Sequence, residues 1–259
     1  MRRAFLLSSR AVAAVKTCIV IPACNEEGRL GVVLDAIRAQ GIGADVIVVD
    51  DGSHDATRGE ALARGATVLS HPFNLGYGSA LHTGYLYARR HGYDRVVQMD
   101  ADGQHDPVSI PDLLRALDAG ADVVIGSRYR HPDPPATTLT RRLGSRFFAW
   151  IVTAWTGVPI TDPTSGFQGL SRSALQEVAK DGFPEDYPDA DVIIAHHLAG
   201  LRLAEVPVRM HPRLGGVSMH RGGRIAFYAY KMLLTLCLLR VRRRAPFRRG
   251  SEIPVPHAP

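Results

Sequence analysis

The stretch Val96-Val97-Gln98-Met99-Asp100-Ala101-Asp102-Gly103-Gln104-His105-Asp106-Pro107 joins an apolar run to a cluster of acidic and polar residues. The apolar run is typical of a buried strand. Asp100 and Asp102 stand two positions apart, and residues with that spacing point to the same side of an extended chain. Two carboxylates placed together repel each other, and a divalent cation relieves that repulsion. The stretch therefore predicts a metal site, to which Gln104 and His105 offer two further acceptor atoms.

The same residues also fit a purely structural interpretation. Asp102-Gly103 is typical of a surface turn, and Asp106-Pro107 is typical of a helix start. Paired aspartates with this spacing are common by chance. The rest of the chain has to decide between the two interpretations.

The first half of the chain alternates short apolar runs with segments of helical periodicity. The predicted strands are Thr17–Pro22, Ala44–Val49, Ala66–Leu69, Asp94–Met99 and Asp122–Gly126. The predicted helices are Gly28–Gln40, a helix that begins near Asp55, Gly78–His91 and Ile110–Ala119. This alternation predicts an α/β fold, a Rossmann-like and mostly parallel sheet with helices on both faces.

Three polar clusters follow three of these predicted strands. They are Pro22–Glu27, Asp50–Ser53 and Asp100–Asp102. The carboxyl ends of parallel strands meet at one edge of a sheet, where α/β proteins bind their ligands. A loop interpretation fits each cluster alone but not their coincidence, so the coincidence favours a cation-dependent site. The segment Asn74–Gly78 fits either a turn that enters a helix or a contact with substrate.

The second half of the chain is less regular. It predicts a helix over Leu143–Trp155, a compact turn at Asp162–Phe167, a helix over Ala190–Leu198 and a strand over Arg202–Met210. No glycine-rich dinucleotide fingerprint follows the first strand. The three cysteines lack metal-ligand spacing and do not form a disulfide framework, which fits a reducing compartment.

The net charge of +6 is largely a property of the C-terminus, where six arginines lie between positions 240 and 249. Without them the chain is close to neutral, which argues against a nucleic-acid groove. We expect a flexible N-terminal leader (1–15), a main α/β domain (16–222), an apolar and basic C-terminal helix (223–244) and a disordered tail (245–259).

The motifs, taken together and in order, resemble those of the family 2 glycosyltransferases with the GT-A fold, in particular the polyprenyl-phosphate (dolichyl-phosphate) mannosyl- or glucosyltransferases. The motifs are Val20–Glu27, Val49–Ser53, Met99–Pro107, Gly126–Tyr129 and Thr164–Phe167. The resemblance covers roughly Thr17 to Ser218. It implies a nucleotide-diphospho-sugar donor of the GDP-mannose or UDP-glucose type, a bound Mg²⁺ or Mn²⁺, and inversion at the anomeric carbon.

The resemblance also implies roles for particular residues. The residues that would hold the base and ribose are Pro22, Cys24, Glu26 and Asp51. Asp100, Ala101 and Asp102 would lie along the ribose and diphosphate, and Asp102 with Gln104, supported by Asp100, would bind the metal. Arg128 would contact the diphosphate or the sugar.

The chain departs from the family pattern at two positions. Cys24 stands where the family commonly has tyrosine, and Met219 stands where these synthases usually have lysine. Arg213 or His220 would then supply the phosphate contact, and we favour Arg213 because arginine stays charged at any working pH.

The acceptor decides whether the reaction needs a base. A lipid phosphate is already anionic, whereas a hydroxyl group needs a carboxylate near the anomeric carbon. Asp191 is our first choice for that carboxylate and Asp186 our second, although a capped helix start also explains acids in this segment. One alternative is the same donor chemistry with a hydroxyl acceptor on a glycan or small molecule. A second alternative is a non-catalytic nucleotide-sugar binding module.

The apolar segment Ile225–Val241 is marginal for spanning a bilayer. Followed by arginines, it fits the inner face of an anionic membrane, and it also fits a packed terminal helix with a solvated tail. We expect a cytoplasmic protein in peripheral contact with the membrane.

Overall fold

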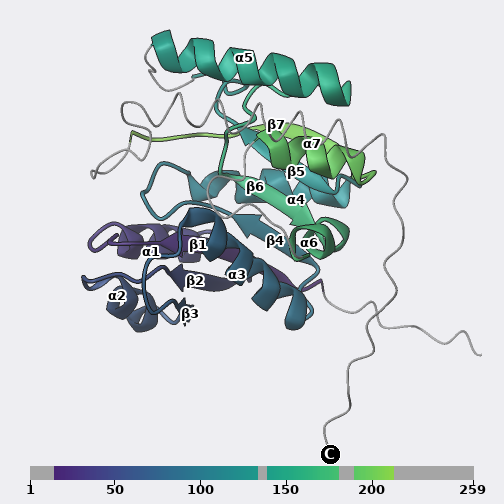
Figure 1. Ribbon diagram of the computed structural model, residues 1–259. Coiled ribbons are helices and arrows are strands. Elements are labelled where there is room, and N and C mark those ends of the chain that lie inside the picture. Colours follow the sequence, from purple (N-terminus) through teal and green to yellow (C-terminus); the bar gives the residue numbers. More distant parts are fainter. Residues whose placement is uncertain (1–14, 134–138, 181–189, 213–259) are drawn as a thin grey trace, which may run out of the picture. The chain divides into compact units, whose positions relative to one another are not determined.

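A computed structural model describes residues 15–133, 139–180 and 190–212 of the chain. Seven strands within these ranges form one sheet in the order β3-β2-β1-β4-β6-β5-β7 (Figure 1). The strands are β1 (Thr17–Ala23), β2 (Asp45–Asp50), β3 (Thr67–Ser70), β4 (Arg95–Gln98), β5 (Val123–Ser127), β6 (Gln168–Ser171) and β7 (Leu203–Pro207). All run parallel except β6, which pairs antiparallel with β4 and β5. The predicted mostly parallel sheet is therefore confirmed.

The predicted helices are present in order, and one further helix, α6, lies among them. The helices of the described residues are α1 (Leu30–Ala39), α2 (Thr57–Ala63), α3 (Tyr77–Arg90), α4 (Ile110–Asp118), α5 (Leu139–Thr156), α6 (Arg172–Val178) and α7 (Ala190–Leu198), with a 3-10 turn, η1, at Pro107–Ser109. The chain enters η1 through Asp106, whose side chain accepts a hydrogen bond from the Val108 backbone N–H. A carboxylate at this position satisfies an amide that the turn leaves unpaired.

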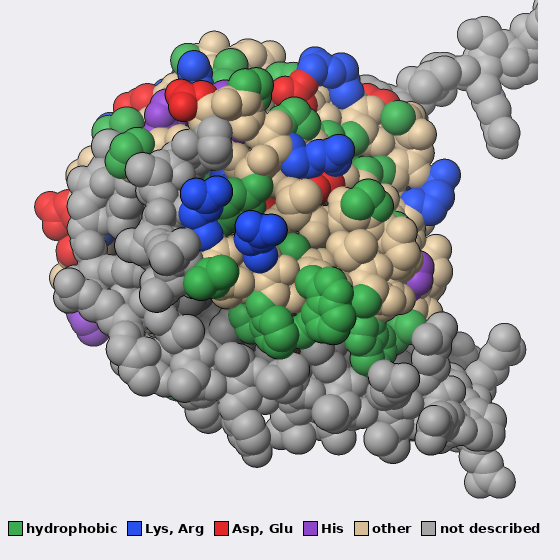
Figure 2. Space-filling model, turned by 90° about the horizontal axis from the view of Figure 1, so that it is seen from above, with side chains coloured by type: hydrophobic (Ala, Val, Ile, Leu, Met, Phe, Trp, Pro, Cys, Tyr) green, Lys and Arg blue, Asp and Glu red, His purple; other side chains and the backbone are tan. Residues whose placement is uncertain are grey.

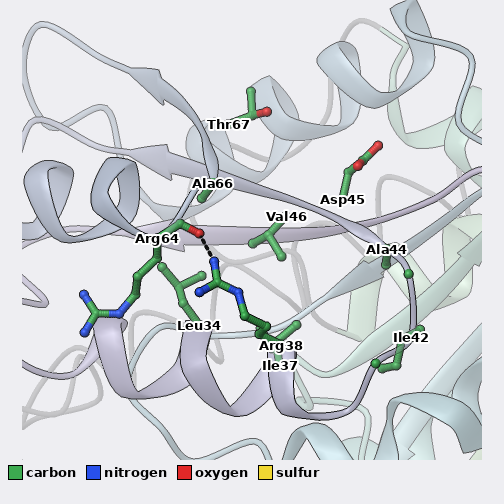
Figure 3. Close-up of a pocket in the computed structure, with 13 residues that line it drawn as sticks. Leu34, Ile37, Arg38, Ile42, Ala44, Asp45, Val46, Arg64, Ala66 and Thr67 are labelled. Atoms are coloured by element: carbon green, nitrogen blue, oxygen red, sulfur yellow. Dashed lines mark hydrogen bonds between the residues drawn. The ribbon is translucent and has the colours of Figure 1, made fainter.

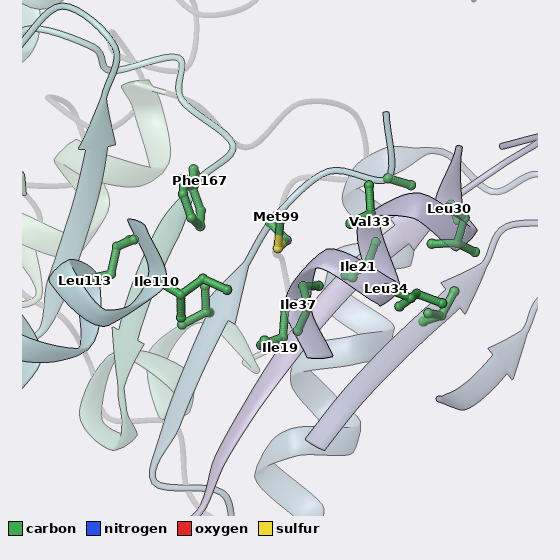
Figure 4. Close-up of a cluster of buried hydrophobic side chains, with 14 of the residues drawn as sticks. Ile19, Ile21, Leu30, Val33, Leu34, Ile37, Met99, Ile110, Leu113 and Phe167 are labelled. Atoms are coloured by element: carbon green, nitrogen blue, oxygen red, sulfur yellow. The ribbon is translucent and has the colours of Figure 1, made fainter. Parts of the chain in front are cut away.

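Helices cover both faces of the sheet, as the alternating pattern predicted. Successive residues of β1 point to opposite faces. Ile19 and Ile21 pack with the apolar sides of α1 and α4, where Met99 and Phe167 complete the cluster (Figure 4). Cys18 and Val20 instead pack with α3 and α6 on the other face. Because both faces are buried, the central strands are apolar at nearly every position.

Close packing of α3 on β1 depends on one glycine. A Cβ atom at Gly84 would overlap Cγ1 of Val20 and lie 3.3 Å from Cγ2 of Val49. Any larger residue would push α3 away from the sheet. Each fully buried aliphatic side chain at this contact contributes about 1.5–3 kcal/mol to stability.

The strand β6 and the helix α6 were not predicted from the sequence. β6 has the sequence Gln-Gly-Leu-Ser, which carries neither an apolar run nor an alternating pattern. Its formation depends on two neighbours, β4 and β5, that leave a strand-wide space between them. Ser171 then ends β6 and begins α6, with its Oγ accepting a hydrogen bond from the Ala174 backbone N–H.

No helix in the described ranges is both long and apolar enough to cross a bilayer.

Candidate active site

Parallel pairing brings the predicted polar clusters to one edge of the sheet. β1 lies between β2 and β4, and Ala23 at the end of β1 is in register with Asp50 at the end of β2. The Asp51 backbone N–H donates to the carbonyl of Ala23 at 2.8 Å. On the other side, the backbone N–H of Met99 donates to the carbonyl of Val20 at 3.1 Å. The segments that follow β1, β2 and β4 thus begin side by side.

The first two segments are joined by reciprocal hydrogen bonds. Asn25 has a positive φ of 55°, and its backbone N–H donates to Oγ of Ser53 at 3.0 Å. Oδ1 of Asn25 accepts in return from the His54 backbone N–H at 2.9 Å. The backbone N–H of Glu26 donates to Oγ1 of Thr57 at 2.7 Å. These bonds fix the backbone around Cys24 and Glu26, two residues predicted to hold the donor.

The side chains predicted to hold the base have different surroundings. Pro22 is buried within β1, whereas Cys24 and Glu26 are half-buried. Sγ of Cys24 accepts from Nδ2 of Asn74 at 3.1 Å, and burial raises the pKa of the thiol. The Glu26 carboxylate pairs with Nε of Arg29 at 2.5 Å.

Asp51 organises the loop that precedes α3. Its carboxylate is buried and accepts backbone N–H bonds from Leu75 at 2.8 Å and from Gly76 at 2.9 Å. Oδ1 also lies 2.7 Å from Nδ1 of His71, whose Nε2 lies 2.9 Å from Oγ1 of Thr83. The segment Asn74–Gly78, which the sequence left open between a turn and a substrate contact, is therefore held in place by Asp51.

A chain of hydrogen bonds, buried at Tyr85 and Gln98, leads to Asp100. Tyr85 donates its hydroxyl hydrogen to Oε1 of Gln98, and Nε2 of Gln98 donates to the hydroxyl oxygen of Tyr77 at 3.1 Å. The Tyr77 hydroxyl then donates to Oδ1 of Asp100 at 2.8 Å. Burial, together with the nearby charge of Asp100, raises the pKa of Tyr77 well above its usual value. Tyr77 therefore remains a neutral hydrogen-bond donor to Asp100.

His105 holds the backbone at Asp100 in place. Its Nδ1 accepts from the Asp100 backbone N–H at 3.0 Å, and its ring stacks on Phe167 with centroids 4.9 Å apart. Nε2 lies 3.7 Å from Oδ2 of Asp100. Burial lowers the pKa of His105, partly offset by Asp100 and Asp102. Because Nδ1 already accepts a backbone hydrogen bond, this nitrogen is not available to a metal ion.

Asp102 and Gln104 were predicted to bind a metal. Asp102 is buried, and its Oδ1 accepts from the Gln104 backbone N–H at 3.0 Å. Mg²⁺ prefers oxygen ligands and is commonly held by one or two carboxylates plus substrate phosphates. In the part of the chain that the structure describes, no group of three or more His, Cys, Asp or Glu side chains is placed to hold a metal ion. In their chemistry, the carboxylate of Asp102 and the amide of Gln104 are oxygen ligands of the kind that fits a cation whose other ligands come from a diphosphate.

Arg128 follows β5 and reaches the same site. Its backbone N–H and Nε both donate to Oδ2 of Asp162, at 3.1 Å and 2.6 Å. Burial lowers the pKa of Arg128, but the charge of Asp162 outweighs it and the net pKa is raised, with a smaller contribution from Asp100. Its terminal nitrogens make no hydrogen bond to another described residue. Among the described residues, the charge of Asp100 is one of those that act on this guanidinium.

Asp162 is itself held by Glu205 on β7. Oε1 of Glu205 accepts backbone N–H bonds from Thr161 at 2.7 Å and from Asp162 at 2.9 Å. Oδ1 of Asp162 is fully buried and has no hydrogen-bond partner among the described residues. Burial raises the pKa of Glu205, and the two backbone amides oppose that shift. The pair Glu205 and Asp162 therefore fixes the position of Arg128.

The two candidate catalytic acids, Asp191 and Asp186, come later in the sequence than the residues described so far. Asp191 lies in the first turn of α7, and its Oδ1 accepts from the backbone N–H of Val192 at 3.0 Å. Asp186 and Arg213 lie outside the described residues, as do the predicted C-terminal helix (223–244) and tail (245–259).

A cavity of about 310 Å³ lies at the opposite edge of the sheet (Figure 3). Its lining includes Asp45 and Thr67, the first residues of β2 and β3, together with Arg38 and Arg64. Arg38 donates to the backbone carbonyl of Arg64 across it. None of the predicted site residues lines this cavity, so it is separate from the candidate active site.

Sequence reasoning missed four side chains that build the site, namely His71, Tyr77, Gln98 and Asp162. Three of them lie in segments that the sequence had singled out, Asn74–Gly78, Val96–Pro107 and Asp162–Phe167. A tyrosine directly after a glycine, and an aspartate before the Thr-Ser-Gly-Phe turn, were the available signals in the sequence. Their partners come from distant strands and cannot be found without the fold.

Comparison with known proteins decides the family. The sequence profile of glycosyl transferase family 2 matches residues 18–179. This chain belongs to the family 2 glycosyltransferases. Its sheet is that of the GT-A fold, as predicted, and the resemblance drawn from the motifs is confirmed.

Two relatives with named activities align along most of the chain. Polyprenol monophosphomannose synthase of Mycolicibacterium smegmatis is 30% identical over 233 residues, covering 84% of this chain and 85% of the relative. Undecaprenyl-phosphate mannosyltransferase of Micrococcus luteus is 31% identical over 220 residues, covering 81% of this chain and 89% of the relative.

Solved structures show the same fold. Glucosyl-3-phosphoglycerate synthase of Mycobacterium tuberculosis in complex with UDP is 25% identical, with a TM-score of 0.66, and covers 87% of this chain and 81% of its own. Another structure of that enzyme contains Mn²⁺ and UDP-glucose, at 24% identity and a TM-score of 0.66, with coverage of 87% and 80%.

Proposed function

We propose that this glycosyltransferase transfers a hexose from a nucleotide-diphospho-sugar, of the GDP-mannose or UDP-glucose type, to a polyprenyl phosphate with inversion. The observation that carries the proposal is the group formed by Asp100, Asp102, Gln104 and Arg128 at the carboxyl ends of β4 and β5. Carboxylate and amide oxygens beside a buried arginine fit a diphosphate with its cation. The two relatives named for polyprenyl-phosphate substrates support the acceptor.

The residues divide the work of the reaction. Asp102 and Gln104 would hold Mg²⁺ or Mn²⁺, and a structure of glucosyl-3-phosphoglycerate synthase, which shares the fold, contains Mn²⁺. When bound, the cation stabilises the negative charge that develops on the departing nucleoside diphosphate. Arg128 binds the diphosphate through its terminal nitrogens, which no described residue engages in a hydrogen bond, and Asp100, held by Tyr77, orients the donor along β4.

A lipid phosphate is anionic at neutral pH and attacks the anomeric carbon without a protein base. Its oxygen forms the new bond to that carbon while the bond to the donor phosphate breaks, and the nucleoside diphosphate leaves with the electron pair. No side chain needs to take a proton in this step.

A hydroxyl acceptor is the second candidate, and the fold shared with glucosyl-3-phosphoglycerate synthase favours it. That reaction requires a base, for which Asp191 and Asp186 are the candidates. The Asp191→Asn variant separates the two functions. It would abolish transfer to a hydroxyl but leave transfer to a phosphate within about threefold of the wild type, because only the hydroxyl has a proton to lose.

Donor binding tests the proposed chemistry directly. We expect a matching nucleotide sugar with Mn²⁺ to raise the melting temperature of the full chain, because a ligand of the folded state stabilises it by mass action. The Asp102→Asn variant, which keeps the size of the side chain, should lose this Mn²⁺-dependent shift. Asp106→Asn is the control in the same loop, since the Asp106 carboxylate contacts His211 and the Val108 backbone instead.

Acceptor identity is tested by transfer of radiolabelled sugar. Label recovered in a lipid fraction that mild acid releases supports the proposal. Label found only on hydroxyl acceptors contradicts the polyprenyl phosphate assignment but keeps the donor chemistry. A donor that binds without transfer or hydrolysis would mean a binding module. We also propose that the chain acts at the cytoplasmic face of the membrane, in peripheral contact with it.

A further inference from the structure

The helix α5 exposes three large apolar side chains to solvent. Leu143, Phe147 and Trp150 are 59%, 47% and 67% exposed. They are four and three residues apart, which places them on one side of the helix. Phe147 stacks on Trp150, with ring centroids 6.4 Å apart. We call these three residues the α5 apolar surface.

The other side of α5 is buried in the domain. Phe148, Ile151 and Val152 are at most 9% exposed. The helix therefore has one apolar side that packs on the protein and a second one that no described residue covers. A helix that is apolar on both sides is not expected at a free surface. The α5 apolar surface thus calls for a partner.

The charged side chains of α5 beside the α5 apolar surface are all positive. Arg142 and Arg146 are exposed next to it on the same helix, and neither forms an ion pair with a described residue. The helix Leu139–Thr156 contains no aspartate or glutamate. Figure 2, which looks down on the side where α5 lies in Figure 1, shows hydrophobic side chains gathered together with basic side chains directly beside them.

The combination of apolar and basic side chains favours an anionic membrane over a second copy of the chain as the partner. A second copy of the chain, paired symmetrically through this surface, would bring the same arginines against each other. An anionic lipid headgroup region instead receives aromatic and aliphatic side chains and neutralises arginines with phosphates. We propose that the α5 apolar surface, with Arg142 and Arg146, binds the surface of an anionic membrane.

The helix is also tied to the active site. α5 lies in the excursion that leaves the sheet after Arg128 and returns at Asp162, and the ion pair between these two residues closes its base. Membrane binding through α5 would therefore hold the donor site close to the lipid phase. This link to a lipid-borne acceptor, like the peripheral membrane contact proposed above, rests on the proposed function, whereas the binding of α5 to vesicles does not depend on the proposed reaction.

Tryptophan fluorescence tests the surface directly. The chain has only two tryptophans, so the Trp155→Phe variant of the full chain reports on Trp150 alone. With vesicles of phosphatidylcholine and phosphatidylglycerol, we expect a blue shift of its emission and quenching by brominated acyl chains. The Phe147→Ser/Trp150→Ser variant of the full chain should bind these vesicles at least tenfold more weakly in flotation.

The arginines and the control sites sharpen the test. Arg142→Gln and Arg146→Gln should each weaken binding to anionic vesicles about fivefold, the factor expected for one basic residue near such a surface, and leave neutral vesicles unaffected. Val32→Ser/Leu62→Ser is the matched control, because these side chains are 54% and 53% exposed on α1 and α2. It should bind like the wild type.

The proposal would be overturned if the chain bound vesicles but the Trp150 emission stayed unchanged and the α5 variants bound as well as the wild type. The contact would then lie elsewhere in the chain. No vesicle binding at all would overturn it too. Donor binding with Mn²⁺ is measured without vesicles, so its loss would contradict the proposed function and leave the membrane result intact.

Discussion

Tyr77 is the side chain whose role at the site is most sharply testable. Its hydroxyl donates to Asp100 and accepts from Gln98. We expect Tyr77→Phe to lower kcat/KM for the donor about tenfold, since a hydrogen bond to a charged group contributes about 1.5–3 kcal/mol. Steady-state kinetics at saturating acceptor measure the effect.

Tyr93→Phe provides the matched control. Tyr93 donates to Oδ2 of Asp45 at 2.7 Å, at the opposite edge of the sheet. Tyr93→Phe should lower the free energy of unfolding about as much as Tyr77→Phe does, measured by urea unfolding, without changing kcat/KM. Equal kinetic losses in the two variants would show that Tyr77 acts only through overall stability.

Asp162 presents a different case, because its partner is a buried charge. Asp162→Asn should destabilise the chain by about 3–5 kcal/mol, since it leaves the Arg128 guanidinium buried and without its carboxylate. Unfolding in urea measures the loss. The double variant Asp162→Asn/Arg128→Met should regain much of the stability but none of the donor binding. If the double variant is as unstable as the single one, the buried charge is not the cause.

At the scale of elements, the turn before β6 sets the space around Asp100. A Cβ atom at Gly166 would lie 3.0 Å from the Tyr77 hydroxyl and 3.1 Å from Oδ1 of Asp100. We therefore expect Gly166→Ala to weaken Mn²⁺-dependent donor binding about tenfold, the effect of displacing these two groups. Thermal shift with the donor measures it.

Gly169→Ala, three residues later within β6, is the comparison. Its Cβ would meet Leu113 at an ordinary 3.4 Å. Donor binding in this variant should stay at the wild-type level. An equal loss in both variants would mean that β6 as a whole, rather than the gap beside Asp100, had moved.

The elements also show how far sequence reasoning reaches. The parallel strands β1, β2 and β4 were predictable because each is a continuous apolar run that ends at polar residues, and those ends locate the site. β6 was not predictable, since Gln168 and Gly169 become strand residues only between two preformed neighbours. Likewise, Asp100 was found from its spacing, whereas Tyr77 was missed because its contact joins α3 to the end of β4.

At the scale of the whole molecule, stability depends on a buried histidine, His196, that is not among the site residues. His196 on α7 is buried, and its Nδ1 has no hydrogen-bond partner among the described residues. Burial lowers the pKa of His196 from 6.5 to about 4, with Glu177 opposing the shift. His196 therefore stays neutral in the folded state at pH values where it is protonated in the unfolded state.

This difference predicts a loss of stability in acid. A histidine with a lowered folded pKa contributes its full stability above the unfolded pKa, and the contribution falls as the pH drops toward the folded pKa. Between pH 8 and pH 5, His196 should account for a loss of about 2 kcal/mol in the free energy of unfolding. Urea unfolding of the wild type and of His196→Gln at both values measures it. The variant should show the smaller decrease, whereas His91→Gln, an exposed histidine at the end of α3, should match the wild type. Identical pH dependence in all three chains would mean that His196 is protonated, or solvated, within the folded molecule.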